Sequence, residues 1–159
     1  MRQSLGPSAL ATVTAMLVVV ALGLPLGFKC GIIVYDPVAL PWLRYATILI
    51  APVLVEELIF RAPLLWVRRE RLLPLGAVLL AGYVLQHAAT AWLIWPDARA
   101  FFWDPCFLLL TAWLGLVNMV LVVATGRVMP AVIVHWLAVT GWMRFLGGED
   151  AISRNLPFG

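Results

Sequence analysis

Long apolar runs dominate this sequence, and short polar or turn-forming segments separate each run from the next. A helix that spans a bilayer needs about 20 mostly apolar residues, and about five runs approach or exceed that length. They cover approximately residues 8–28, 42–66, 73–95, 106–124 and 129–145. We therefore expect an all-α fold, a polytopic membrane helix bundle of about five transmembrane helices that forms a single membrane-embedded domain over residues 1–159.

The segments between the runs have the composition of turns and membrane interfaces. Residues 29–41 contain glycine, aspartate and proline, which are typical of turns. Residues 96–105 combine polar residues with aromatic ones, which favours an interfacial loop at the level of the lipid headgroups. Residues 147–159 are polar and show no periodic pattern, so we expect an irregular tail there.

The overall composition supports lipid as the solvent of this chain. Hydrophobic residues make up 64% of the sequence and charged residues only 12%, whereas soluble domains carry about 25% charged residues. The net charge of +3 is small, and no basic stripe with interleaved aromatic residues is present. Nucleic-acid binding is therefore not expected, and membrane lipids are the expected surroundings.

One cluster of basic residues predicts the orientation in the membrane. Arg68, Arg69 and Arg71 lie between two predicted spans, and the positive-inside rule places such a loop in the cytoplasm. With five spans, the C-terminus then lies outside. The other basic residues divide between the two sides: Arg2 and Arg127 inside, and Lys29, Arg44, Arg99, Arg144 and Arg154 outside. We expect a multi-pass integral protein of a bacterial cell (inner) membrane.

The two cysteines are too few for a disulfide framework and lack the spacing of metal ligands. Cys30 and Cys106 both fall near the predicted outer face. A single disulfide and two unpaired thiols are both compatible with this placement, and we expect two unpaired membrane cysteines.

Three charged residues interrupt the second apolar run. Glu56, Glu57 and Arg61 each cost about 2.5–3.5 kcal/mol at the centre of a bilayer unless they are compensated. Glu57 and Arg61 are four residues apart, so they lie on nearly the same helical face and can form an ion pair. Glu56 points about 100° away from Glu57 and is left without a local partner.

The only histidines of the chain, His87 and His135, both lie inside predicted spans. Counted along the helices from the nearest predicted cytoplasmic arginine, Glu56, His87 and His135 lie at depths of about 18, 24 and 12 Å. Three side chains that can ionise at broadly similar depth indicate a functional intramembrane site, which we expect to be reached from the cytoplasm.

Hydrolysis is the chemistry that these three side chains favour. A carboxylate can act as a general base on water, and a histidine can shuttle the proton. A second histidine can donate a hydrogen bond to the oxyanion of the tetrahedral intermediate. No Ser–His or Cys–His pairing is evident in the sequence, so water is the expected nucleophile.

The charged and histidine-bearing segments resemble the CPBP family of CAAX-protease and bacteriocin-processing intramembrane proteases. Residues 56–61 match its EExxxR motif. Residues 83–87 are similar to its FxxxH motif, with Tyr83 in place of Phe. Residues 135–139 are similar to its HxxxN motif, with Val139 in place of Asn. The resemblance covers residues 41–142.

The resemblance implies a role for each matched side chain. Glu56 and His87 would activate water, His135 would hold the oxyanion, and Glu57 with Arg61 would form a structural ion pair. Val139 cannot donate a hydrogen bond where the family has Asn, and losing one oxyanion donor typically costs about 10²–10³ in rate.

Val139 leaves three alternatives open: a neighbour such as Thr140 substitutes as the donor, activity is slow, or this chain does something else.

Three functions remain open on these residues. The preferred one is a glutamate-type intramembrane endopeptidase that acts near the cytoplasmic interface on a membrane protein or a lipidated peptide. The second is a non-catalytic membrane scaffold, chaperone or immunity protein that binds a partner or hydrophobic ligand. The third is a metalloprotein in which Glu56, His87 and His135 bind zinc, although no HExxH motif is present. We expect no cofactor.

Overall fold

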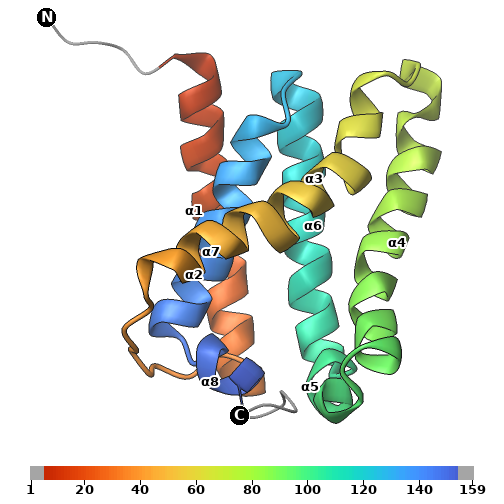
Figure 1. Ribbon diagram of the computed structural model, residues 1–159. Coiled ribbons are helices and arrows are strands. Elements are labelled where there is room, and N and C mark those ends of the chain that lie inside the picture. Colours follow the sequence, from red (N-terminus) through yellow and green to blue (C-terminus); the bar gives the residue numbers. More distant parts are fainter. Residues whose placement is uncertain (1–5, 154–159) are drawn as a thin grey trace, which may run out of the picture.

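The computed structural model describes residues 6–153, and this part of the chain is almost entirely helical. Its long helices run alongside one another, as Figure 1 shows. They are α1 (Pro7–Cys30), α4 (Leu72–Leu93), α6 (Pro105–Thr125) and α7 (Met129–Phe145). The only pairing of strand type among residues 6–153 is an isolated bridge between Asp36 and Leu146. The prediction of an all-α fold is confirmed.

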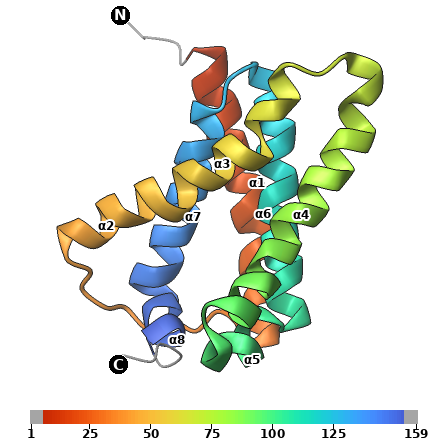
Figure 2. The ribbon, with the colours of Figure 1, turned by 45° about the vertical axis from the view of Figure 1, so that its right-hand side comes forward.

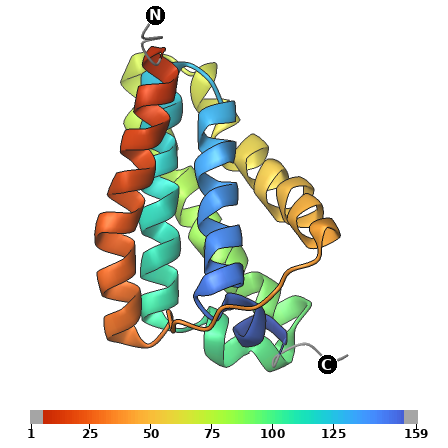
Figure 3. The ribbon, with the colours of Figure 1, turned by 90° about the vertical axis from the view of Figure 1, so that its left-hand side faces the viewer.

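Short helical segments join the long ones. The chain after α1 passes α7 and α8 (Gly148–Ser153) before it enters α2 (Trp42–Ile48), as Figure 3 shows. The segments are α2 (Trp42–Ile48), η1 (Leu49–Leu54), α3 (Val55–Phe60), η2 (Ala62–Leu65), η3 (Arg69–Arg71), η4 (Pro96–Ala98), α5 (Arg99–Phe102) and α8 (Gly148–Ser153). The predicted loop at 96–105 and the predicted irregular tail therefore each contain helix.

Three helices of the described chain are long and apolar enough to cross a membrane: α1, α4 with its preceding η3 turn, and α6. Many of their large apolar side chains are exposed, among them Leu17 and Leu73 at 64% and 86%. Such surfaces need lipid, which agrees with an integral membrane protein. The count of five spans stays unconfirmed, although α7 begins and ends at the predicted residues.

The prediction of one continuous helix over 42–66 is wrong. Ala51 adopts an extended conformation (φ −139°, ψ 118°) immediately before Pro52, because proline disfavours helical geometry in the residue that precedes it and lacks an N–H for the helical ladder. The broken segment from α2 to α3 crosses the bundle obliquely (Figures 1 and 2). This break puts Glu56 and Glu57 in the first turn of α3.

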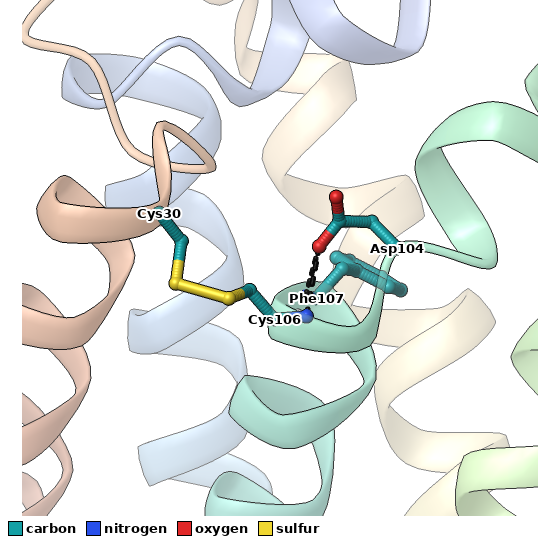
Figure 4. Close-up of a disulfide and its surroundings, with 4 residues drawn as sticks. All are labelled: Cys30, Asp104, Cys106 and Phe107. Atoms are coloured by element: carbon teal, nitrogen blue, oxygen red, sulfur yellow. Dashed lines mark hydrogen bonds between the residues drawn. A yellow bond between two sulfur atoms is a disulfide. The ribbon is translucent and has the colours of Figure 1, made fainter.

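The expectation of two unpaired cysteines is also wrong, because Cys30 and Cys106 form a disulfide. α1 and α6 run in opposite directions, so the last residue of α1 meets the first turn of α6, and the two Cα atoms lie 6.2 Å apart. Figure 4 shows Asp104 beside the bridge, where its Oδ1 accepts hydrogen bonds from the backbone N–H groups of Cys106 and Phe107. This cap fixes where α6 begins.

The arginine cluster and the disulfide lie at opposite ends of the bundle. α4 starts at the cluster and ends at the α5 segment that leads into Cys106, and Figure 1 shows this arrangement. Arg2 and Arg154, which the sequence assigned to the two sides of the membrane, lie outside the described residues.

Candidate active site

Four helices bring polar side chains together in the interior of the bundle. α3 and the residue after it supply two carboxylates and a guanidinium, α4 supplies three polar side chains, and α6 and α7 supply one each. These residues are Glu56, Glu57, Arg61, Tyr83, Gln86, His87, Asn118 and His135.

His135 lies between the two glutamates. Its Nδ1 donates to Glu57 Oε1 at 2.8 Å, because a carboxylate only accepts and the hydrogen must therefore sit on the ring nitrogen. Its Nε2 lies 3.7 Å from Glu56 Oε2 and 3.5 Å from the Tyr83 hydroxyl. Glu57 thus holds the imidazole so that its second nitrogen faces Glu56.

Glu57 has further partners, and all of them are buried. Asn118 Nδ2 donates to Glu57 Oε1 at 3.0 Å, and Arg61 Nε lies 3.6 Å from Glu57 Oε2. The predicted partners Glu57 and Arg61 are therefore placed together, and both side chains are fully buried. The His135 contact is shorter than the Arg61 contact, however, so Glu57 also orients a candidate catalytic ring.

The Arg61 guanidinium lies against the Tyr83 ring, with its Cζ 3.7 Å from the ring centroid. Such cation–π contacts favour a cation that water no longer hydrates. Gly115 of α6 makes room for this stack, since a Cβ there would lie 2.8 Å from Tyr83 Cδ1 and 3.0 Å from Arg61 Nη2. The absence of a side chain on Gly115 thus allows α6 to approach the buried pair.

Glu56 is held by a residue of α4. Gln86 Nε2 donates to Glu56 Oε1 at 2.7 Å and also lies 3.3 Å from His87 Nδ1. His87 Nδ1 lies 2.9 Å from the backbone carbonyl of Tyr83, which only accepts, so this contact puts the hydrogen of a neutral ring on Nδ1 and leaves Nε2 as the acceptor. With the hydrogen on Nδ1, the Gln86 amide makes no hydrogen bond to His87. Sequence reasoning left Glu56 unpartnered, whereas the structure gives it a donor from Gln86, the residue that precedes His87.

A cavity of about 750 Å³ adjoins these side chains, and Glu56, His87 and His135 all line it. The rest of its lining is mostly apolar. On the long helices its lining residues fall within 16–24 of α1, 83–90 of α4, 107–114 of α6 and 135–145 of α7. Most of these residues lie in the halves nearer the disulfide, so the cavity extends from the site towards that end of the bundle. The expected access from the cytoplasm stays a prediction.

No side chain of α7 replaces the hydrogen-bond donor that the resembled family has as Asn at the position of Val139. Val139 packs in an apolar cluster around Val132 and Met143. The Thr140 hydroxyl donates to the backbone carbonyl of Trp136 at 2.6 Å, and Thr140 does not line the cavity. Thr140 is therefore not placed to substitute. Among the described lining residues, the Tyr83 hydroxyl is the donor that lies beside His135 Nε2.

Sequence reasoning missed Asn118, Gln86 and the hydroxyl of Tyr83 as parts of the site. Asn118 had a usable signal, because it is a single amide inside the apolar run of α6 and is fully buried. Burying an amide without a partner costs about 1–3 kcal/mol, so a partner on another helix is expected. Gln86 carried the same signal, because it is the single amide inside the apolar run of α4.

Metal ligation by this cluster has no geometric support within residues 6–153. No group of three or more His, Cys, Asp or Glu side chains in that range is arranged to hold a metal ion. Whether the protein uses a cofactor stays a prediction.

Comparison with known families gives one match over most of the chain. A protein-family model described as type II CAAX prenyl endopeptidase Rce1-like matches residues 38–140. The matched region contains all of the motif residues and almost coincides with the region 41–142 that carries the sequence resemblance. Comparisons with curated proteins and with solved structures gave no match.

Proposed function

Because the chain belongs to the Rce1-like family of type II CAAX prenyl endopeptidases, we propose that it is an intramembrane endopeptidase in which Glu56 and His87 activate water. The fold is that of a CAAX-type intramembrane protease. The observation that carries the proposal is the position of Glu56, His87 and His135 on one cavity inside the helix bundle. Its substrate would be a membrane protein or a lipidated peptide, and its location a bacterial inner membrane.

Glu56 is suited to take a proton from water. Gln86 occupies its Oε1. Oε2 faces the cavity beside His135 Nε2, at 3.7 Å, and would accept the proton as the water oxygen attacks the peptide carbonyl carbon. His87 Nε2 offers a second acceptor on the same cavity. When the C–N bond breaks, the proton passes from Glu56 or His87 to the departing amine, and the acid and amine products leave with atoms balanced.

His135 would stabilise the oxyanion, which requires a hydrogen on Nε2. The ring then carries both protons, and Glu57 at Nδ1 compensates the charge. Two glutamates, Arg61 and a protonated His135 sum to zero charge. A set of buried charges that sums to zero limits the desolvation cost of placing charge in a membrane.

The Tyr83 hydroxyl would supply the second donor that Val139 lacks. It lies 3.5 Å from His135 Nε2, where the resembled family has a phenyl ring without a hydroxyl. Once Nε2 carries a hydrogen it no longer accepts from Tyr83, so the hydroxyl is free to donate to the oxyanion. In this proposal the second oxyanion donor is the hydroxyl of Tyr83 on α4, where the resembled family uses the Asn amide on the helix that corresponds to α7.

Turnover of a membrane-inserted reporter peptide in proteoliposomes tests the proposal. Glu56→Gln should abolish turnover, because an amide does not accept the proton of water. Glu70→Gln makes the same chemical change at an exposed residue of η3 and should leave the rate unchanged. A Glu56→Gln protein with the full rate would refute the peptidase, and one that keeps its full cellular role would favour a non-catalytic scaffold.

The proposal uses no metal. Chelation during the assay should therefore leave the wild-type rate unchanged, and loss of turnover on chelation would favour the zinc alternative.

A further inference from the structure

The two ends of the bundle carry opposite chemical signals. At one end, Arg68, Arg69 and Arg71 lie in and beside η3. At the other end, the Cys30–Cys106 disulfide joins α1 to α6 (Figure 4). Disulfides form and persist in oxidising compartments, whereas basic loops between spans stay in the cytoplasm. These independent signals agree that the disulfide end faces the non-cytoplasmic side.

The cavity beside the candidate catalytic residues lies on the disulfide side. Its lining begins at Tyr83 on α4 and at His135 on α7, and continues from there towards the disulfide end of both helices. No described residue of 72–82 or 129–134 lines it. The cavity therefore extends from the polar cluster in one direction only, away from the arginines.

Packed side chains close the opposite direction. Val122, Ala131 and Val134 are fully buried and form one apolar cluster with neighbours on α1 and α6. They occupy the arginine-side halves of α6 and α7. A core packed to this degree admits no peptide, so a route from the arginine end would require the helices to separate.

The rim of the cavity reaches the surface near α2 and α8. Arg44 lines the cavity, its side chain is 34% exposed, and its Nη2 lies 3.1 Å from Glu149 Oε2. Thr47, one turn further along α2, is exposed and also lines the cavity. A charged, partly exposed rim is suited to a polar peptide, while the apolar walls suit a lipid chain or apolar side chains.

We propose that the peptide to be cleaved reaches Glu56 from the disulfide-bearing, non-cytoplasmic face. The substrates are then membrane-anchored or lipid-modified proteins whose cleaved segment lies outside the cytoplasm, rather than cytoplasmic prenylated tails. The identity of the substrate rests on the proposed peptidase function. The direction of access does not, because it follows from the cavity, the packed core and the disulfide.

Thiol labelling in intact cells tests the direction of access. The native cysteines are joined, so a cysteine introduced at Thr47 or Ala138, both on the cavity, is the only free thiol. A membrane-impermeant maleimide added outside should label Thr47→Cys and Ala138→Cys. Glu70→Cys, exposed beside the arginine cluster, should be labelled only after permeabilisation. The same variants with Cys30→Ser and Cys106→Ser exclude thiol exchange.

The proposal is overturned if neither Thr47→Cys nor Ala138→Cys is labelled in intact cells. It is also overturned if Glu70→Cys is labelled from outside. The unmodified chain supplies a second readout, since it should react after denaturation only if a reductant is present. Reaction of the denatured chain with the maleimide in the absence of reductant would show that the disulfide is absent. That result would overturn the proposed orientation.

Labelling does not depend on turnover, so the two proposals fail separately. An inactive protein labelled from outside refutes the peptidase and leaves the access route standing. An active protein whose cavity positions are labelled only after permeabilisation supports the peptidase and refutes the access route.

Discussion

Glu57 Oε1 and His135 Nδ1 are 2.8 Å apart, although 78 residues separate them in the chain. The second glutamate of the motif therefore holds the ring whose other nitrogen faces the first glutamate at 3.7 Å. A carboxylate on one imidazole nitrogen fixes the tautomer and stabilises the protonated ring. Replacing Glu57 should consequently affect both stability and chemistry, whereas an ion pair with Arg61 alone would affect stability.

Arg61→Met should lower the melting temperature of the detergent-solubilised protein. Removing one partner of a buried pair leaves an uncompensated charge, at a cost of about 3–5 kcal/mol. Combining Arg61→Met with Glu57→Gln should cost less than the sum of the two single changes, because neither charge is then left alone. Thermal melts that show additive losses would contradict the coupling between Glu57 and Arg61.

Tyr83→Phe should lower kcat by about 10²–10³ if its hydroxyl is the second oxyanion donor, with little change in melting temperature. Tyr35 is 73% exposed, so Tyr35→Phe removes the same hydroxyl away from the site and serves as the control. Adding Val139→Asn to Tyr83→Phe should restore part of the rate. An unchanged kcat in Tyr83→Phe would exclude the hydroxyl from the reaction.

Asn118→Leu should destabilise the fold by about 1.5–3 kcal/mol, the usual value of a hydrogen bond to a charged group. The new side chain has similar size but does not donate to Glu57 Oε1. Asn118→Asp should be worse, since it places a second carboxylate against Glu57. Melting temperatures that rank Asp above Leu would indicate that Asn118 does not serve Glu57.

Loss of the disulfide should cost about 2–5 kcal/mol, because the bridge closes a loop across 76 residues of sequence. Wild-type protein should melt at a lower temperature after reduction. The variant with Cys30→Ser and Cys106→Ser should melt at that lower temperature with or without reductant. A wild-type melt that does not respond to reductant would show that the bridge contributes nothing to stability.

A reporter that is active only outside the cytoplasm should be active when fused to the C-terminus, because α8 lies at the disulfide end (Figure 1). The same reporter inserted at Gly126, in the turn between α6 and α7, should be inactive. The reverse pattern would invert the orientation and return the cavity to the cytoplasmic side.

The lengths of the apolar runs were sufficient to locate α1, α4, α6 and α7 to within a few residues. A helix in lipid satisfies its own backbone hydrogen bonds, so its existence depends mainly on local sequence. The motif residues could also be identified from the sequence, since a charged residue or a histidine is unusual within an apolar run. The run over 42–66 was predicted as one span, so neither the break before Pro52 nor the oblique course of the chain around it was predicted.

Only the tertiary structure decided which of these side chains meet. The i,i+4 spacing correctly placed Glu57 beside Arg61, because that contact lies within one turn. The contacts from Glu57 to Asn118 and His135 join different helices, as does the bridge from Cys30 to Cys106. Helix order and packing set such distances. The direction of the cavity likewise depends on which halves of the helices pack tightly, a property shared by several helices and carried by no single segment of sequence.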